Sequence, residues 1–236
     1  MTDLHVFAQR DGYRETQWER DGKYGWGNNR GLVLMKSWDL INWKRTNICF
    51  DQMSAGLSEI GCAWAPEITF DEKKGKLMIY FTMRFRNEPN KLYYVYVNDE
   101  FDTIETLPRT LFEYPNEKVS AIDGDITKIG DQYHLFYVAH DGEAGIKHAV
   151  SNIANGDYTF DPRWYDLEPK ACEAPNVWKR IGEDKWVLMY DVYSVNPHNF
   201  AFIETSDFVN FKNLGRFNEG AVSYTHLRAH ETLSDL

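Results

Sequence analysis

Carboxylates open two of the strand-like repeats in this chain of 236 residues. Residues 122–125 read Ile-Asp-Gly-Asp, and residues 173–176 read Glu-Ala-Pro-Asn. Two carboxyl groups around a pocket suit hydrolysis of a glycosidic bond, because one donates a proton to the leaving oxygen while another stays ionised to activate water. By spacing alone, a plain acidic turn at Asp123 and a solvated strand start at Glu173 fit somewhat better than a catalytic pair. The choice between these interpretations therefore depends on the elements that position the two residues.

A hairpin-like pattern repeats three times along the chain. The runs 76–80 (KLMIY), 133–137 (YHLFY) and 186–190 (WVLMY) each follow a polar turn. Their last residues, Tyr80, Tyr137 and Tyr190, are 57 and 53 residues apart (137 − 80 and 190 − 137). Periods near 50 residues in β-rich sequence are typical of propeller blades, because one small sheet must stack on its neighbours to bury both faces.

The repeat predicts where the carboxylates lie. Aligning the hairpins places residues 64–67, 122–125 and 173–176 at equivalent positions, just before the first strand of each repeat. The first strand of a propeller blade lines the central channel, so residues at its mouth converge from different blades. We therefore expect Asp123 and Glu173 to be neighbours in space.

Composition narrows the class of protein. Hydrophobic residues make up 43% of the chain, enough for one sizeable core, so we expect a single all-β domain. A net charge of −10 argues against nucleic-acid or anionic-membrane partners, which need clustered Lys and Arg. No apolar run approaches the roughly 20 residues of a membrane-spanning helix. Three cysteines without a CxxC pair predict neither zinc nor a disulfide framework, and no cofactor or metal site is expected.

Two further segments carry structural predictions. The turn at residues 37–43 (SWDLINW) recurs at 205–211 (TSDFVNF), with Asp39 matching Asp207, and its Asp and Asn suit a tight structural turn. The stretches 84–90 and 98–118 are predicted to be polar turn regions. The last residues, 221–236, break the strand rhythm and resemble a translated sequencing-adapter read-through, so we expect a propeller domain over 1–220 and a non-native tail.

Three ordered segments resemble successive blades of glycoside hydrolase family 43: WAPEITFDEKKGKLMIYFTM, AIDGDITKIGDQYHLFYV and CEAPNVWKRIGEDKWVLMYDVY. The segment RGLVLMKSWDLINW resembles the end of the family's first blade, and the likeness extends over about residues 22–219. The resemblance implies a five-bladed β-propeller that inverts at the anomeric carbon of α-L-arabinofuranosides or β-D-xylosides in plant glycans. It implies three carboxylates: a base, an aspartate that tunes the acid, and a glutamate acid.

The resemblance assigns roles to particular residues. Asp123 matches the tuning aspartate, with Asp125 as a lower-ranked alternative that could also contact substrate. Glu173 matches the general acid, in a motif that reads Glu-Ala-Pro where the family has Glu-Gly-Pro. Trp64 and Trp26 are predicted to stack on a sugar face, although ordinary blade packing fits them equally well. Arg84 is predicted to donate to sugar hydroxyls.

The base has no counterpart by the same comparison. The family carries it in an Asp-Pro motif at the start of the first blade, whereas the chain's Asp-Pro, Asp161-Pro162, falls in another blade. We therefore expect about four blades of an incomplete ring, truncated at both ends, which by itself hydrolyses nothing measurable.

Two other classes of protein stay open. A non-catalytic carbohydrate-binding propeller would keep sugar affinity without a base. A protein-interaction propeller of the kelch or WD kind is disfavoured, because the Gly-His and Trp-Asp signatures are missing.

Overall fold

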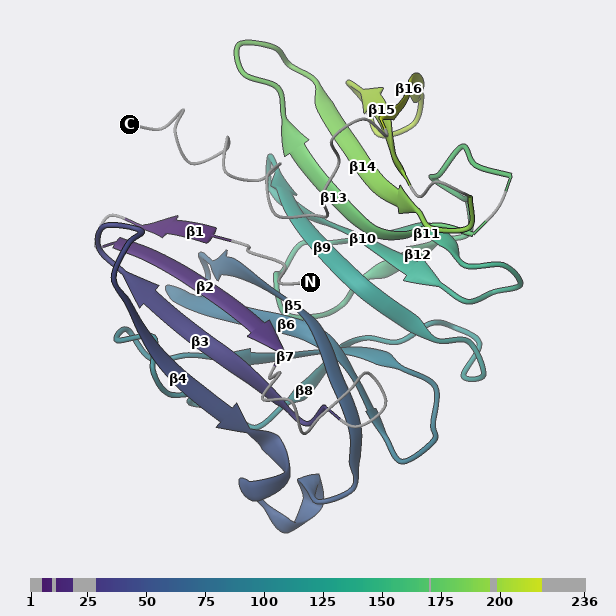
Figure 1. Ribbon diagram of the computed structural model, residues 1–236. Coiled ribbons are helices and arrows are strands. Elements are labelled where there is room, and N and C mark those ends of the chain that lie inside the picture. The colour runs from purple at the N-terminus through teal and green to yellow at the C-terminus, as the bar shows by residue number, and fades with distance from the viewer. Residues whose placement is uncertain (1–5, 10–11, 19–28, 170, 196–198, 218–236) are drawn as a thin grey trace.

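The computed structural model describes residues 6–9, 12–18, 29–169, 171–195 and 199–217. These residues form four antiparallel sheets of four strands, each sheet built from strands consecutive in the chain (Figure 1). Blade I contains β1 (Val6–Gln9), β2 (Gly12–Trp18), β3 (Gly31–Ser37) and β4 (Trp43–Cys49), and blade II contains β5 (Ile60–Asp71), β6 (Lys76–Phe85), β7 (Lys91–Tyr96) and β8 (Arg109–Phe112). Blade III contains β9 (Ala121–Ile129), β10 (Gln132–Ala139), β11 (Gly145–Ser151) and β12 (Thr159–Asp161). Blade IV contains β13 (Glu173–Lys179), β14 (Trp186–Val192), β15 (Asn199–Thr205) and β16 (Lys212–Phe217). Two short 3-10 turns, η1 (Phe50–Gln52) and η2 (Ala55–Leu57), connect blade I to blade II.

Three apolar cores hold the blades together. The first joins blades I and II, the second joins II and III, and the third joins III and IV; none of these three joins blade IV to blade I. Each sheet is too thin to bury both faces alone, so neighbouring blades share their apolar side chains. This arrangement confirms the predicted fold, an all-β member of the five-bladed propeller class with about four blades. The expected tail at 221–236 lies outside the described residues.

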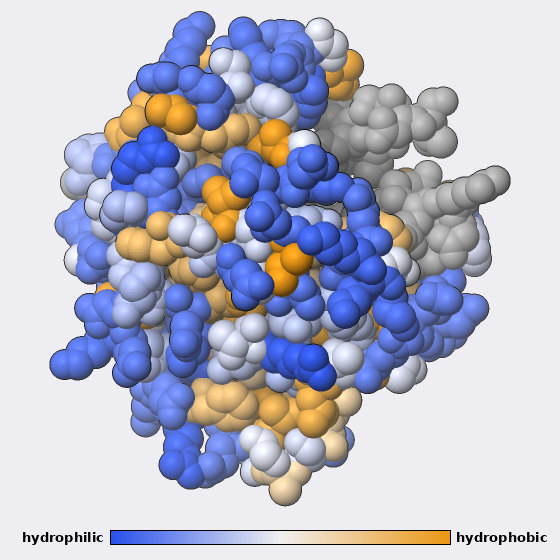
Figure 2. Space-filling view, turned by 180° about the vertical axis from the view of Figure 1, so that it is seen from behind, coloured by the Kyte–Doolittle hydropathy of each residue, from blue (hydrophilic) through white to orange (hydrophobic). Residues whose placement is uncertain are grey.

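The outer surface is mostly polar. Seen from behind, hydrophilic residues cover most of the molecule and apolar residues form separate patches between them (Figure 2). Within the described residues, no helix is long and apolar enough to cross a membrane.

Strand register corrects the alignment of the three repeats. In blades II, III and IV the first strand bulges, so that two of its residues lie opposite a single residue of the second strand, which is Phe81, Tyr137 or Tyr190. All three side chains pack toward the preceding blade. The prediction that Tyr80 is the counterpart of Tyr137 and Tyr190 was wrong by one residue. Tyr80 packs toward blade III instead, because a shift of one position in a strand moves a side chain to the other face.

The segment 98–118 is not entirely a turn region. It contains β8, a four-residue strand that completes blade II by pairing with β7. Leu111 and Phe112 of this strand are buried between blades II and III. The prediction missed β8 because so short an edge strand leaves little alternation to detect among polar flanking residues.

The two predicted turns are built alike. Asp39 accepts the backbone N–H groups two and three residues later at 2.9 and 2.7 Å, and Asp207 does the same at 2.9 and 2.8 Å. Their surroundings differ. Phe208 is 7% exposed and packs on His134 and Phe136 of blade III, whereas its counterpart Leu40 is 48% exposed. The turn of blade IV therefore locks two blades together, and the turn of blade I contacts no described blade in this way.

Phe208→Ala should lower the free energy of unfolding by about 3 kcal/mol, because it removes a buried ring and leaves a cavity between blades III and IV. Leu40→Ala is the matched control and should cost less than about 0.5 kcal/mol, since that side chain is already exposed. Urea unfolding followed by tryptophan fluorescence measures both. Equal losses would contradict the interblade role of Phe208.

A buried imidazole pair lies beneath Phe208. His134 Nδ1 and His148 Nε2 are 3.1 Å apart, and His148 Nδ1 lies 3.2 Å from the Tyr165 hydroxyl. Burial lowers the pKa of His134, and burial together with its neighbour lowers the pKa of His148 to about 3. Both rings are therefore neutral at pH 7 in the folded protein.

We predict that acid weakens the fold through His148. An unfolded histidine titrates near pH 6.5, so between about pH 6.5 and 3 the unfolded chain binds a proton that the folded protein does not, and the free energy of unfolding falls. His148→Gln should flatten this dependence, measured as the urea midpoint at pH 7.5 and pH 5. An unchanged slope would show that other groups control it.

Candidate active site

The first strands of three blades carry the same bulge at the same place. The two residues that lie opposite a single partner are Ala65-Pro66 in β5, Asp123-Gly124 in β9 and Ala174-Pro175 in β13. The first residue of each pair has a left-handed backbone, with φ of 43°, 51° and 51°. The structure thus confirms that residues 64–67, 122–125 and 173–176 are equivalent. Asp123 stands on its bulge, and Glu173 stands one residue before the bulge of the next blade.

Blade II holds the bulge that carries Asp123. The backbone N–H of Asp123 donates to Thr82 Oγ1 at 3.0 Å, and Thr82 is completely buried. A Cβ at Gly124 would lie 2.9 Å from the Leu92 side chain, so the chain passes too close to blade II for any larger residue. These contacts hold the half-buried Asp123 in a conformation that non-glycine residues seldom adopt.

Glu173 begins β13 directly after a fixed point. The backbone N–H of the buried Cys172 donates to the carbonyl of Ala144, which precedes β11. Glu173 itself is half-buried and pairs across the strand with Asp191. Blade III therefore positions the start of the strand that presents Glu173.

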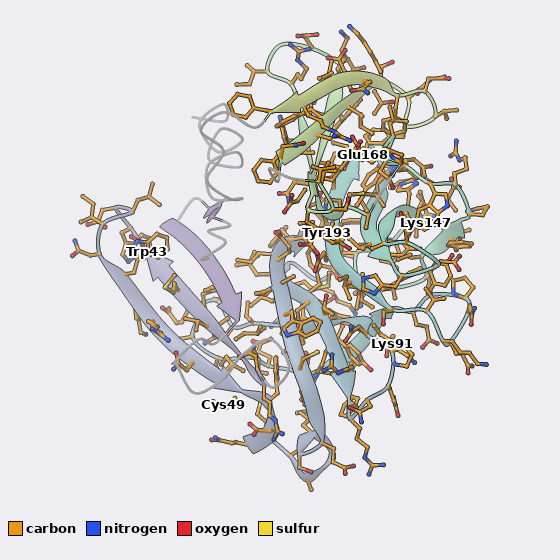
Figure 3. The ribbon with its side chains drawn as sticks, turned by 45° about the vertical axis from the view of Figure 1, so that its right-hand side comes forward. Trp43, Cys49, Lys91, Lys147, Glu168 and Tyr193 are labelled. Atoms are coloured by element: carbon orange, nitrogen blue, oxygen red, sulfur yellow. The ribbon has the colours of Figure 1, made fainter. Side chains whose placement is uncertain are left out.

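The charges of both carboxylates act on the hydroxyl of Tyr193. It follows the end of β14 and is half-buried between the sheets (Figure 3). Burial is the main cause that raises the pKa of its hydroxyl, and the negative charges of Glu173, Glu143 and Asp123 raise it further. Asp123 and Glu173 thus lie within electrostatic range of one hydroxyl, as their predicted convergence requires.

Sequence reasoning missed Tyr193 and His140. With the corrected register, Arg84, His140 and Tyr193 each stand three residues after the residue opposite the bulge. They are therefore equivalent positions at the ends of three second strands. The repeat could have revealed them, but an alignment on Tyr80 pairs Arg84 with the wrong residues of the other blades.

The predicted substrate-binding residues of blade II lie together. The Arg84 guanidinium is 5.2 Å from the centroid of the Trp64 ring, and its Nη1 donates to Asn90 Oδ1 at 3.4 Å. Asn90 in turn donates its backbone N–H to Ser120 Oγ at 3.0 Å and accepts the N–H of Ala121, the first residue of β9. Trp64 and Arg84 are thereby tied to the strand that carries Asp123.

Two other predicted residues do not join them. Asp125 has no exposed surface, and its Oδ2 accepts the backbone N–H of Val177 at 2.8 Å. Its carboxylate therefore braces blade III against blade IV, and this burial does not support contact with a substrate. Trp26 lies outside the described residues. Within the described residues, no three His, Cys, Asp or Glu side chains are grouped as metal ligands would be.

The family model described as "Probable glycosyl hydrolase domain", related to glycoside hydrolase family 43, matches residues 1–232. The chain belongs to this family. Members of glycoside hydrolase family 43 hydrolyse glycosidic bonds, so the predicted class of enzyme is confirmed. No curated protein matched the chain in sequence.

Solved structures share the fold at low sequence identity. An endo-1,4-β-xylanase from Bacteroides thetaiotaomicron is 18% identical with a TM-score of 0.59, an exo-β-1,3-galactanase from Clostridium thermocellum is 13% identical with 0.71, and a Bacillus subtilis arabinanase is 17% identical with 0.66. The matches cover 92%, 93% and 93% of this chain, and 75%, 48% and 81% of those chains, respectively. At these identities the likeness shows the fold and leaves the substrate open.

Thr82→Val should release the bulge of Asp123, because it removes the hydroxyl that accepts the Asp123 N–H. We expect a loss of about 1–2 kcal/mol in the free energy of unfolding and at least tenfold faster hydrogen exchange at the Asp123 amide. Thr82→Ser keeps the hydroxyl and should retain the slow exchange. Identical exchange in the two variants would show that Thr82 does not position Asp123.

Proposed function

We propose that this chain contributes the proton-donating part of an inverting glycosidase site for α-L-arabinofuranosyl or β-D-xylosyl linkages. The observation that carries the proposal is the placement of Asp123 and Glu173 on neighbouring first strands, both within range of Tyr193. Family membership supports the class of reaction.

The proposed roles are those that the resemblance to glycoside hydrolase family 43 implies for the two groups. Glu173 donates its proton to the glycosidic oxygen as the bond from that oxygen to the anomeric carbon breaks. Asp123 orients Glu173 and keeps it protonated until that step. A third carboxylate removes a proton from the water that attacks the opposite face, and inversion requires it to lie roughly 6.5–9.5 Å from the acid. None of the described residues is assigned to this base.

The sugar would lie against blade II. Trp64 offers an aromatic surface to the C–H face of the ring, and Arg84 offers guanidinium N–H groups to hydroxyl oxygens. His140 and Tyr193 stand at the equivalent positions of blades III and IV, so they are the next candidates for contact with hydroxyl groups. Arabinose and xylose differ in ring size and hydroxyl geometry, and these four side chains are placed to distinguish them.

The acid role of Glu173 predicts a dependence on the leaving group. With azide present to attack the anomeric carbon in place of activated water, Glu173→Gln should lower kcat by roughly 100-fold or more on an unactivated arabinoside or xyloside, because the departing alkoxide then lacks a proton. A 4-nitrophenyl glycoside needs no such proton, so its turnover should fall much less. Equal losses on both substrates would contradict the acid role.

These assays should be run with and without sodium azide, because no base is assigned among the described residues. Azide can attack the anomeric carbon without a base, so turnover that requires azide would indicate an intact acid and a missing base. Turnover without azide would show that the chain supplies a base of its own.

A non-catalytic carbohydrate-binding propeller is the second candidate, favoured by the lack of an assigned base. It predicts that Glu173→Ala leaves sugar affinity unchanged and that azide restores no turnover. Isothermal titration with arabino- and xylo-oligosaccharides separates the two functions.

A further inference from the structure

An exposed tryptophan stands on a built support at the edge of blade III. Trp164, between β12 and β13, is 44% exposed. Lys147 Nζ lies 3.7 Å from the centroid of its ring, and Lys147 is itself only 3% exposed. The same ammonium donates to the carbonyl of Pro162, two residues before the tryptophan. Lys147 therefore covers one face of the ring and holds the chain beside it.

The edge of the ring is also fixed. A Cβ at Gly145 would lie 2.9 Å from Cε3 and Cζ3 of Trp164, so the ring rests directly on the glycine backbone. The next two residues are pinned to β11: Tyr165 N–H donates to the carbonyl of Ile146, and Asp166 accepts the Ile146 N–H, both at 2.8 Å. Lys147 and Gly145 thus restrict the orientation in which the exposed Trp164 is presented.

This platform lies at the same end of blade III as Asp123. In the register of blade III, Ala121 pairs with Ala139, and Ala139 pairs with Gly145. Adjacent strands are about 4.8 Å apart, so Gly145 lies roughly 10 Å outward from the strand that carries Asp123. The segment that bears Trp164 then continues to Glu173. Trp164 is therefore on the rim of the mouth, farther from Asp123 than one sugar ring can span.

We propose that Trp164 is a distal binding platform for a sugar ring of a polymeric glycan that extends across blade III. A rigid aromatic face stacks on the C–H-rich face of a sugar and loses little conformational entropy in doing so. The proposal rests on the proposed function for the direction in which the glycan runs from the site. It specifies a polysaccharide rather than a short glycoside as the ligand.

Trp38 is a matched control. It is 66% exposed and also has a lysine over its ring, with Lys36 Nζ 5.1 Å from the centroid. It follows β3, whose start corresponds to the mouth of blade I, so Trp38 stands at the opposite end of its blade. A nonspecific affinity of exposed tryptophan for glycans would affect both positions equally.

The test is native affinity electrophoresis of the full chain in gels that contain xylan, arabinan or β-1,3-galactan. Glu173→Gln serves as the parent, so that no hydrolysis alters the gel. We expect retardation by at least one of the three polysaccharides, a roughly fivefold or greater loss of affinity in Trp164→Ala, and little change in Trp38→Ala. Trp164→Phe should recover part of the affinity, and near-UV circular dichroism checks that each variant is folded.

Retardation by none of the three polysaccharides, or equal losses in Trp164→Ala and Trp38→Ala, would overturn the proposal. These outcomes are distinct from a failure of the proposed function. Loss at Trp164 with no turnover by the wild-type chain, either with or without azide, would keep the platform and refute the glycosidase. Leaving-group-dependent turnover without retardation would do the reverse.

Discussion

Burial between neighbouring blades is the constraint on which the rest of this structure depends. The sheets of blades II and III place alternate side chains of one strand into two different cores, so that Phe81 packs toward blade I while the adjacent Tyr80 packs toward blade III. Every blade thereby needs the apolar face of its neighbour, and the relative positions of the blades follow from the packing. The position of a residue at the mouth of a blade therefore depends on packing contacts in the apolar cores between blades.

Polar bonds refine what the apolar cores establish. Tyr80 accepts the N–H of Ile126 from the next blade, and Asp125 accepts the N–H of Val177 from the one after it. A buried backbone group left without a partner costs free energy, so such bonds favour one register between blades and disfavour registers shifted from it. The bond between Asp125 and Val177 connects β9 and β13, the first strands that carry Asp123 and Glu173.

Bulges turn this packing into a site. A regular strand at the mouth would alternate its side chains strictly between the two neighbouring blades. One extra residue in each bulge and a left-handed backbone change the direction of the chain at Asp123 and just beyond Glu173. The bulge occurs in blade II as well, where Trp64 occupies the position of Glu173. One backbone device thus presents an aromatic ring in one blade and a carboxylate in another.

Much of the site could be read from the repeats, because the residues before each bulge keep their order. The equivalence of 64–67, 122–125 and 173–176 required only the turn and strand pattern. Tyr193 and His140 were missed because terminal tyrosines in three strands looked equivalent, although Phe81 is the true counterpart of Tyr137 and Tyr190. Only burial reveals a shift by one residue, since both alternating positions of these strands are apolar.

The amino-acid sequence by itself determined the all-β class, the blade period, the family and the two carboxylates, because these depend on local pattern and on motifs of adjacent residues. Only the tertiary structure decided that Asp125 braces two blades, that the charges of Asp123 and Glu173 both act on Tyr193, and that Trp164 stands exposed beside Lys147. Each of these depends on contacts between residues distant in the chain, and burial and charge at a position are properties of the packed neighbours rather than of the residue type.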